Sequence, residues 1–193
     1  MSKRAPGQPR RARDFYPTPP EAVLPLVPHL PRRGATYVEP CAGAGDLIRG
    51  LELHWPQGRC IGASDLEPQA PGIAVGDARS ITESAAHLFI TNPPWPRMGS
   101  RGEPVISLAR HLASLRPTWL LLPFDFAAAG YFAALGPLCA RIVPVGRVSW
   151  MGNGVGGKDN AAWFLFDTGH VGATAFHPRL STPEAAPGLA VAA

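Results

Sequence analysis

A short apolar run that ends in two consecutive prolines constrains the fold of this chain more than any other stretch. Residues 87–90 are expected to form a buried strand, and Asn92-Pro93-Pro94-Trp95 follows almost at once. Proline lacks a backbone N–H and fixes φ, so the strand must end there in a stiff turn. The turn presents one planar amide and one flat indole. This pair suits a planar substrate with an amino group, such as a nucleobase; the alternative is an ordinary Asn-Pro loop with a surface Trp.

Strands and helices are expected to alternate along most of the sequence. Apolar runs predict strands at residues 36–39, 59–64, 72–75, 87–90, 119–122, 141–145 and 162–166. Apolar residues at helical spacing predict helices at residues 21–30, 47–55, 105–115 and 126–135, the first capped by Thr18. We therefore expect an α/β fold with a mostly parallel seven-stranded sheet and helices on both faces. The last two strands have no helix between them, so we also expect an antiparallel edge strand.

Polar residues follow five of the expected strands. Parallel strands present their carboxyl ends at one edge of a sheet, and open α/β sheets bind ligands in the crevice outside that edge. These side chains should therefore form one site. They are Glu39, Asp65, Asp77, Asn92 and Asp125.

A glycine-rich turn after the first strand predicts a nucleotide-type site. Gly43 and Gly45 would let a ligand approach the backbone beside the free N–H groups of the next helix. Asp65 lies 20 residues beyond Gly45, where dinucleotide folds place the acid that binds ribose hydroxyls. The turn is not a full G-x-G-x-x-G, because Ile48 stands at the third glycine position. The sequence also lacks a G-x-x-x-x-G-K-[ST] phosphate loop, which argues against ATP hydrolysis.

Composition predicts a globular domain without a membrane span or a metal centre. The chain has 193 residues, 46% of them apolar, and no apolar run approaches the ~18 residues of a membrane helix. Cys41, Cys60 and Cys139 are scattered and odd in number, which favours reduced thiols in the cytoplasm. No Cys/His cluster has the spacing of zinc ligands.

The motifs, taken in order, resemble those of the class I S-adenosylmethionine-dependent methyltransferases. The resemblance covers residues 14–167 and rests on 38–45 (VEPCAGAG), Asp65, Asp77 and the tetrad at 92–95. Within this class, the tetrad resembles that of enzymes that act on amino groups. This resemblance implies a Rossmann-like methyltransferase fold.

Two further stretches narrow the resemblance. Residues 14–19 (DFYPTP) are similar to the first motif of small bacterial and phage adenine-N6 DNA methyltransferases, and the strand at 163–166 also fits that group. The implied function is methyl transfer from S-adenosylmethionine to the N6 amino group of adenine in DNA.

The resemblance assigns the cofactor contacts to eight residues. Thr18 and Pro19 would border the methionine part of S-adenosylmethionine. Glu39, Gly43 and Gly45 would cradle the cofactor. Asp65 would bind the ribose, Leu66 would pack on the adenine ring, and Asp77 would accept a hydrogen bond from the adenine amino group.

The catalytic residues implied by the resemblance are Asn92, Pro93, Pro94 and Trp95. Hydrogen bonds from the target amine to the Asn92 side-chain oxygen and the Pro93 carbonyl would free the nitrogen lone pair. Both acceptors would also stabilise the positive charge that develops on nitrogen. Trp95 would stack on the extruded base.

The sequence says less about how a target is recognised than about the chemistry of the reaction. The stretch between Trp95 and Trp119 is too short for a recognition domain of ordinary size. We expect a nucleic-acid partner, DNA above all, and contacts from Arg97, Arg101, Arg147, Trp150 and Lys158. Trp150 could instead be a hydrophobic plug on the sheet edge.

Other functions stay open. RNA adenine, cytosine N4 and a protein glutamine amide are alternative methyl acceptors within the same fold. A nicotinamide-dependent oxidoreductase and a non-catalytic nucleic-acid-binding module are alternatives outside this activity. Monomer and dimer are both compatible with the sequence.

The expected domain organisation is a flexible basic arm at residues 1–13, one catalytic domain at 14–167 and an Ala/Pro-rich tail at 168–193. The net charge is +4, and the arm carries Lys3, Arg4, Arg10, Arg11 and Arg13 without an acid. Basic arms of this kind often contact nucleic-acid phosphates. A solvated tail is the alternative.

Deletion of residues 1–11 tests the role of the arm. The deletion removes four cations, and each phosphate contact contributes ~0.9 to the slope of log affinity against log salt. We expect the slope on duplex DNA to become shallower by up to about 3.6, with no change in the methylated sequence, because phosphate contacts carry no sequence information. Fluorescence anisotropy across a salt series measures the slope. An unchanged slope would make the arm a solubilising tail.

Overall fold

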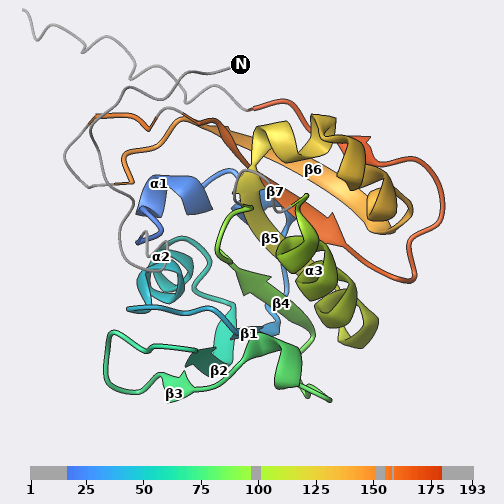
Figure 1. Cartoon of the computed structure of the whole chain (residues 1–193). Helices are drawn as coiled ribbons and strands as arrows, with labels where there is room; N and C mark the ends of the chain where they lie inside the picture. Colours follow the sequence, from blue (N-terminus) through green and yellow to red (C-terminus); the bar gives the residue numbers. More distant parts are fainter. Residues whose placement is uncertain (1–16, 97–100, 151–154, 158, 180–193) are drawn as a thin grey trace, which may run out of the picture.

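One eight-stranded sheet organises the molecule, and its strands follow the order β3-β2-β1-β4-β5-β7-β6-β8. The structure is a computed structural model that describes residues 17–96, 101–150, 155–157 and 159–179 (Figure 1). The strands are β1 (Thr36–Glu39), β2 (Arg59–Asp65), β3 (Ala74–Val75), β4 (Leu88–Thr91), β5 (Thr118–Pro123), β6 (Cys139–Gly146), β7 (Ala161–Phe166) and β8 (Ala175–Phe176).

The sheet is mostly parallel, as predicted. β3, β2, β1, β4 and β5 form a continuous parallel set, and β8 pairs in parallel with β6. The carboxyl ends of the first five strands therefore lie at one edge. The strand order reverses direction between β1 and β4, and such a switch point is where open α/β sheets bind ligands.

The antiparallel strand lies inside the sheet, so its predicted place at an edge is wrong. β7 pairs antiparallel with both β5 and β6. Without a crossover helix, the chain leaving β6 turns back beside it, and β7 inserts between β6 and β5. Five of the six β7 residues are buried. A continuous apolar run of this kind is typical of an interior strand, because both of its faces are covered.

The sheet also extends beyond the boundary that the sequence suggested at residue 167. β8 pairs Ala175 with Arg141 and Phe176 with Ile142 of β6. This pair brings the strand count to eight instead of seven. A two-residue strand has too little sequence to produce a recognisable pattern.

Helices cover both faces of the sheet, as predicted. α1 (Pro20–Val23) and α2 (Asp46–His54) lie on one side, and α3 (Glu103–Leu115) lies on the other (Figure 1). Short 3₁₀ turns complete the layers at η2 (Val27–His29), η3 (Ala78–Ser80), η4 (Phe124–Ala128), η5 (Gly130–Ala134) and η6 (Gly136–Leu138).

Two of the predicted helices are largely 3₁₀ turns. The helix expected at residues 21–30 ends at Val23, because Pro25 and Pro28 lack the N–H that an α-helix needs there. The helix expected at residues 126–135 is replaced by η4 and η5, whose connecting bonds join residues three apart, as in Phe132 N–H to the Ala129 carbonyl. Its apolar residues also recur every third position, the period of a 3₁₀ helix.

A buried tryptophan fixes α1 against the middle of the sheet. Trp163 of β7 has no exposed surface, and its indole N–H donates to the Ala22 carbonyl of α1 at 2.7 Å. The segment that leads into α1 is thereby held at the carboxyl edge of the sheet. Within the described ranges, no helix combines the length and the apolar character needed to cross a bilayer.

Replacing Trp163 with Phe tests this attachment. The change removes the N–H that Ala22 accepts and leaves the volume of the second ring unfilled. We expect the free energy of unfolding to fall by about 2–3 kcal/mol, measured by urea denaturation. Leu53→Ala is the control, because Leu53 is 68% exposed and its loss should change stability by no more than about 0.5 kcal/mol. Equal stabilities of the two variants would contradict the attachment.

Candidate active site

The turn after β1 adopts a conformation that glycine favours. Gly43 has a φ of 53° and Gly45 a φ of 79°, both in the left-handed region. Gly45 is also the N-cap of α2 and no side chain caps this helix end. The first N–H groups of α2 are therefore directed toward the carboxyl edge of the sheet without a side chain of the cap over them.

Asp65 joins this turn to the end of β2. Its Oδ2 accepts the Gly43 N–H at 2.8 Å, and its Oδ1 accepts the Glu67 N–H at 2.9 Å. Each carboxylate oxygen can accept a further hydrogen bond. The carboxylate can therefore hold the turn and still bind ribose hydroxyls, which is its predicted role.

Glu39 is the most deeply buried acid of the site. It is 1% exposed, and its Oε2 has no hydrogen-bond partner. Burial raises the pKa of Glu39 well above its usual value, and the nearby carboxylates of Asp65 and Asp46 raise it further. A buried acceptor without a donor is costly, so this oxygen indicates a missing donor or cation.

A cavity of about 150 Å³ opens between the ends of β1, β2, β3 and β4 and the first turns of α3. Five predicted site residues line it, namely Asp65, Leu66, Asp77, Pro93 and Pro94. The lining also includes Pro40, Cys41, Ala78, Arg79, Pro104, Val105 and Leu108, to which the sequence analysis assigned no ligand contact. The other predicted cofactor residues, Thr18, Pro19, Glu39, Gly43 and Gly45, lie outside this lining.

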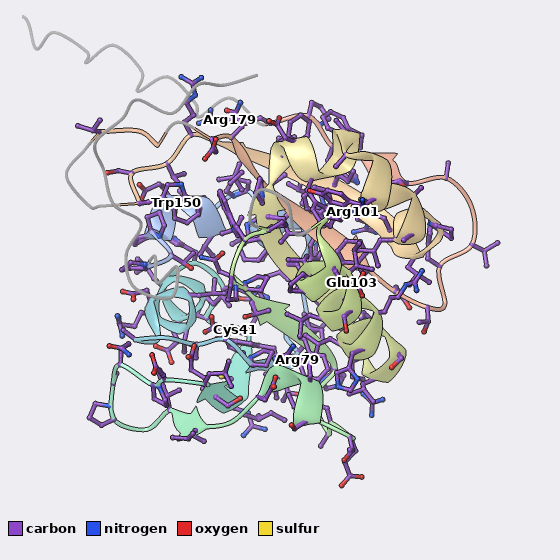
Figure 2. The ribbon with its side chains drawn as sticks, viewed as in Figure 1. Cys41, Arg79, Arg101, Glu103, Trp150 and Arg179 are labelled. Carbon is purple, nitrogen blue, oxygen red and sulfur yellow. The ribbon has the colours of Figure 1, made fainter. Side chains whose placement is uncertain are left out.

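Arg79 is the charged residue that sequence reasoning missed (Figure 2). Its guanidinium donates to both carboxylate oxygens of Asp77, at 3.1 Å and 3.0 Å, and its backbone N–H donates to Oδ1 at 2.9 Å. These bonds hold the pKa of Asp77 below its usual value. The two-residue spacing between Asp77 and Arg79 was the available signal. Asp77 therefore shares its acceptor capacity between Arg79 and any ligand in the cavity.

Cys41 lines the same cavity, where burial disfavours the thiolate form that a cysteine nucleophile needs. Burial raises the pKa of its thiol to about 12, so the thiol stays protonated at neutral pH. This fits its position in the turn after β1 as a small space-filling residue.

The tetrad lies at the end of β4, and its amide is fixed from both sides. The Asn92 Nδ2 donates to the Thr18 hydroxyl at 3.0 Å. The Trp95 indole N–H lies 3.2 Å from the Asn92 Oδ1 and 3.0 Å from the Leu121 carbonyl of β5. Thr18 therefore contacts Asn92 and does not cap α1, whose N-cap is the half-buried Pro19. The sequence separation of 74 residues hides this contact from sequence analysis.

The predicted nucleic-acid contacts are only partly described. Arg101 and Arg147 are exposed, whereas Trp150 is half-buried with its ring edge-on to Trp95 at a centroid distance of 5.1 Å. Trp150 thus lies beside Trp95 of the tetrad. Arg97, Lys158 and the basic arm lie outside the described residues. Their roles stay predictions.

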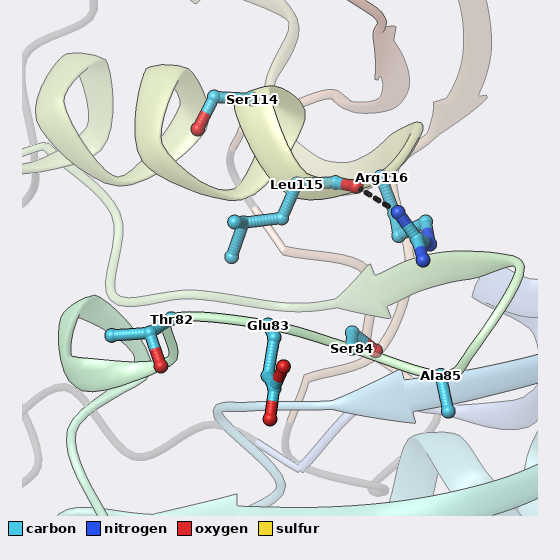
Figure 3. A pocket seen from close by; sticks show the side chains of 7 residues that line it. All are labelled: Thr82, Glu83, Ser84, Ala85, Ser114, Leu115 and Arg116. Carbon is cyan, nitrogen blue, oxygen red and sulfur yellow. Dashed lines mark hydrogen bonds between the residues drawn. The ribbon is translucent and has the colours of Figure 1, made fainter.

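A larger cavity of about 650 Å³ lies at the opposite, amino-terminal edge of β4 and β5 (Figure 3). Arg116 at its rim donates to the backbone carbonyls of Ala86 and Leu115 and so stabilises the entry into β5. None of the predicted site residues belongs to its lining, which is Thr82, Glu83, Ser84, Ala85, Ser114, Leu115 and Arg116.

Comparisons with known proteins find similarity in structure but not in sequence. No family model matches the chain, and no curated protein sequence matches it. A candidate RNA methyltransferase from Pyrococcus horikoshii superposes with a TM-score of 0.51 at 14% identity, over 76% of this chain and 81% of the other. A dimethyladenosine transferase from Plasmodium falciparum superposes with a TM-score of 0.51 at 12% identity, over 79% of this chain and 62% of the other.

These similarities define the fold. Together with the strand order and the helices on both faces, they confirm the predicted Rossmann-like class I methyltransferase fold. This chain spans less than two thirds of the length of the Plasmodium protein.

Replacing Glu39 with Gln tests the cost of its burial. The folded pKa lies above the unperturbed 4.5, so the unfolded chain loses this proton first as the pH rises. The free energy of unfolding of the wild type therefore decreases as the pH rises from about 4.5 to the pKa of Glu39 in the folded protein. Gln has no proton to lose, so the Glu39→Gln variant should lack this decrease. We expect Glu39→Gln to exceed the wild type at pH 8 by about 1–3 kcal/mol and to match it near pH 4.

Urea denaturation of the ligand-free protein across this pH range measures the difference. Glu83→Gln, at an exposed position, is the matched control and should follow the wild-type pH profile. A Glu39→Gln profile that also follows the wild type would refute the buried-acid interpretation.

Proposed function

We propose that this protein transfers a methyl group from S-adenosylmethionine to the exocyclic N6 amino group of adenine in DNA. One observation carries the proposal. The oriented amide of Asn92 stands at the end of β4, in the tetrad whose two prolines line the cavity beside the glycine-rich turn.

The charges around the glycine-rich turn favour a cationic cofactor. The carboxylates of Asp65 and Asp46 raise the pKa of Glu39, whereas Arg49, which pairs with Asp46 at 2.7 Å, lowers it and offsets only part of this negative charge. A cation bound among the carboxylates would stabilise their ionised forms and provide the missing partner of the Glu39 Oε2. S-adenosylmethionine carries a sulfonium and an ammonium group. Glu39 would hold the positively charged methionine part of this cofactor.

The cavity suits the uncharged remainder of the same cofactor. Asp65 offers free acceptor capacity for ribose hydroxyls, and Asp77 offers it for an amino group. Leu66, Val105 and Leu108 provide apolar surface on which an adenine ring can pack. When bound, S-adenosylmethionine supplies a methyl group on a positively charged sulfur, which leaves as a neutral thioether when a nitrogen takes the methyl group.

The task of the protein at the acceptor is to prepare that nitrogen. The amino lone pair of adenine is conjugated with the ring and attacks poorly. The Asn92 Oδ1 and the Pro93 carbonyl would each accept one amino N–H, which frees the lone pair for the methyl carbon. Both oxygens also stabilise the positive charge that the nitrogen acquires before it releases a proton to water. No dedicated base is required, because the methylated ammonium is acidic.

We propose a nucleic acid as the partner because the protein is positively charged and two of its arginines near the site are exposed. Arg101 and Arg147 are exposed, and Arg147 lies three residues before Trp150, which packs on the tetrad. The overall charge of +4 favours an anionic partner, and a nucleic acid is one. Adenine in RNA, cytosine N4 and a protein glutamine amide are the outcomes that would redirect the proposal.

Parallel assays with labelled S-adenosylmethionine on DNA, RNA and protein test the function. We expect label in DNA and N6-methyladenine in its digest by mass spectrometry. Asn92→Ala should lower turnover by about 10²–10³-fold, the usual effect of removing one preorganised transition-state contact, and leave cofactor affinity within about twofold. Asn160→Ala is the matched control, because Asn160 is an exposed asparagine outside the site. If only 4-methylcytosine appears, the assigned base is wrong, and if only RNA is labelled, the assigned nucleic acid is wrong.

A further inference from the structure

The hydrogen bonds around Asn92 leave one orientation for its side-chain amide. An indole N–H can only donate, so the amide atom that faces it must be the oxygen. The Trp95 Nε1 lies 3.2 Å from this atom, and the amide nitrogen then faces the Thr18 hydroxyl at 3.0 Å. The orientation thus follows from the chemistry of the indole, and not from the choice between two similar atoms.

Both partners of the amide are themselves fixed. The Trp95 N–H is shared with the Leu121 carbonyl at 3.0 Å, which attaches the tetrad to the neighbouring strand β5. Thr18 is 5% exposed and lies two residues before the start of α1, whose Ala22 carbonyl is bonded to Trp163. The Asn92 amide is consequently held from β5 on one side and from α1 on the other.

We propose that Trp95 and Thr18 are positioning residues that set the direction of the Asn92 side-chain oxygen, and that Trp95 does so through its indole N–H. This inference rests on the proposed function, because it assigns that oxygen to the target amine. An amide oxygen accepts two hydrogen bonds. Trp95 takes one, and the second lone pair is left in a fixed direction for the amino N–H. An acceptor that is already oriented has no reorganisation to undergo during the reaction.

The packing of the Trp95 ring supports a role for the N–H. Trp95 is half-buried and packs against both main apolar clusters of the core. The ring of Trp150 meets it edge-on, with an angle of 85° between the ring planes. These contacts hold the indole where its N–H reaches two acceptors. Stacking of the ring on a base is the competing role.

Isosteric replacement separates the two roles of Trp95. Benzothienylalanine keeps the fused ring and carries sulfur in place of the N–H, whereas Trp95→Phe removes both the N–H and the second ring. We expect kcat to fall about tenfold with either, the factor that one hydrogen bond in the transition state provides, and KM to stay within about twofold. Thr18→Val should lower kcat similarly, and Thr18→Ser, which keeps the hydroxyl, should restore it.

Trp55→Phe is the matched control. Trp55 also donates its indole N–H to a backbone carbonyl, that of Pro31 at 3.1 Å, but it lies at the end of α2. Its replacement should affect stability and leave kcat unchanged. If the benzothienylalanine variant keeps full kcat while Trp95→Phe raises KM, the ring acts by stacking and the inference is overturned.

A measurement on the protein without substrate tests the positioning of Asn92 whatever the methyl acceptor is. The ¹⁵N–¹H signals of the Asn92 side-chain amide report its orientation in the protein alone. We expect them to shift in the benzothienylalanine and Thr18→Val variants and to return in Thr18→Ser. Unchanged signals would overturn the inference whatever the activity. Shifted signals in a protein that methylates no amino group would leave the positioning intact and refute the proposed function.

Discussion

The carboxylate of Asp65 is the constraint on which the cofactor side of the structure depends. β1 and β2 are parallel neighbours, and each ends in a turn with backbone N–H groups beyond the paired part of the strands. Asp65 accepts one N–H from each turn, from Gly43 and from Glu67. The Ala42 N–H adds a bond to the Ser64 carbonyl across the same gap. The left-handed glycine turn, the start of α2 and the wall of the cavity are thus held to the end of β2 by this side chain together with backbone bonds.

The general architecture could be predicted from the sequence because it depends on local patterns. Continuous apolar runs such as Leu120–Leu122 identify strands that are covered on both faces. The alternation with helices then makes the sheet parallel and brings Glu39, Asp65, Asp77 and Asn92 to one edge. β7 carries the same kind of run, so its burial inside the sheet was also visible in the sequence. The prediction that β7 lies at an edge was wrong because it was based mainly on the absence of a helix between β6 and β7.

The contacts within the site could not be predicted, because they join residues that are far apart in the chain or compete for the same atoms. Thr18 is a good N-cap residue by type, yet its hydroxyl is used by Asn92, and α1 begins without a side-chain cap. Asp77 was expected to be available to a ligand, but Arg79 occupies part of its acceptor capacity. The turns η4 and η5 are separated by Ala129 in an extended conformation, and the triplet spacing of Phe126, Ala129 and Phe132 is a signal that a search for helical period overlooks.

Within the described residues, both edges of the sheet end in strands of two residues, β3 on one side and β8 on the other. An edge strand exposes unpaired N–H and C=O groups, which can recruit the strand of another molecule and start aggregation. A long apolar edge would be a hazard here, since Val75 and Phe176 are 81% and 56% exposed. Two residues offer too few hydrogen bonds to hold an incoming strand in register. The brevity of β3 and β8 therefore keeps an extensively apolar sheet from propagating into a fibril through these two strands.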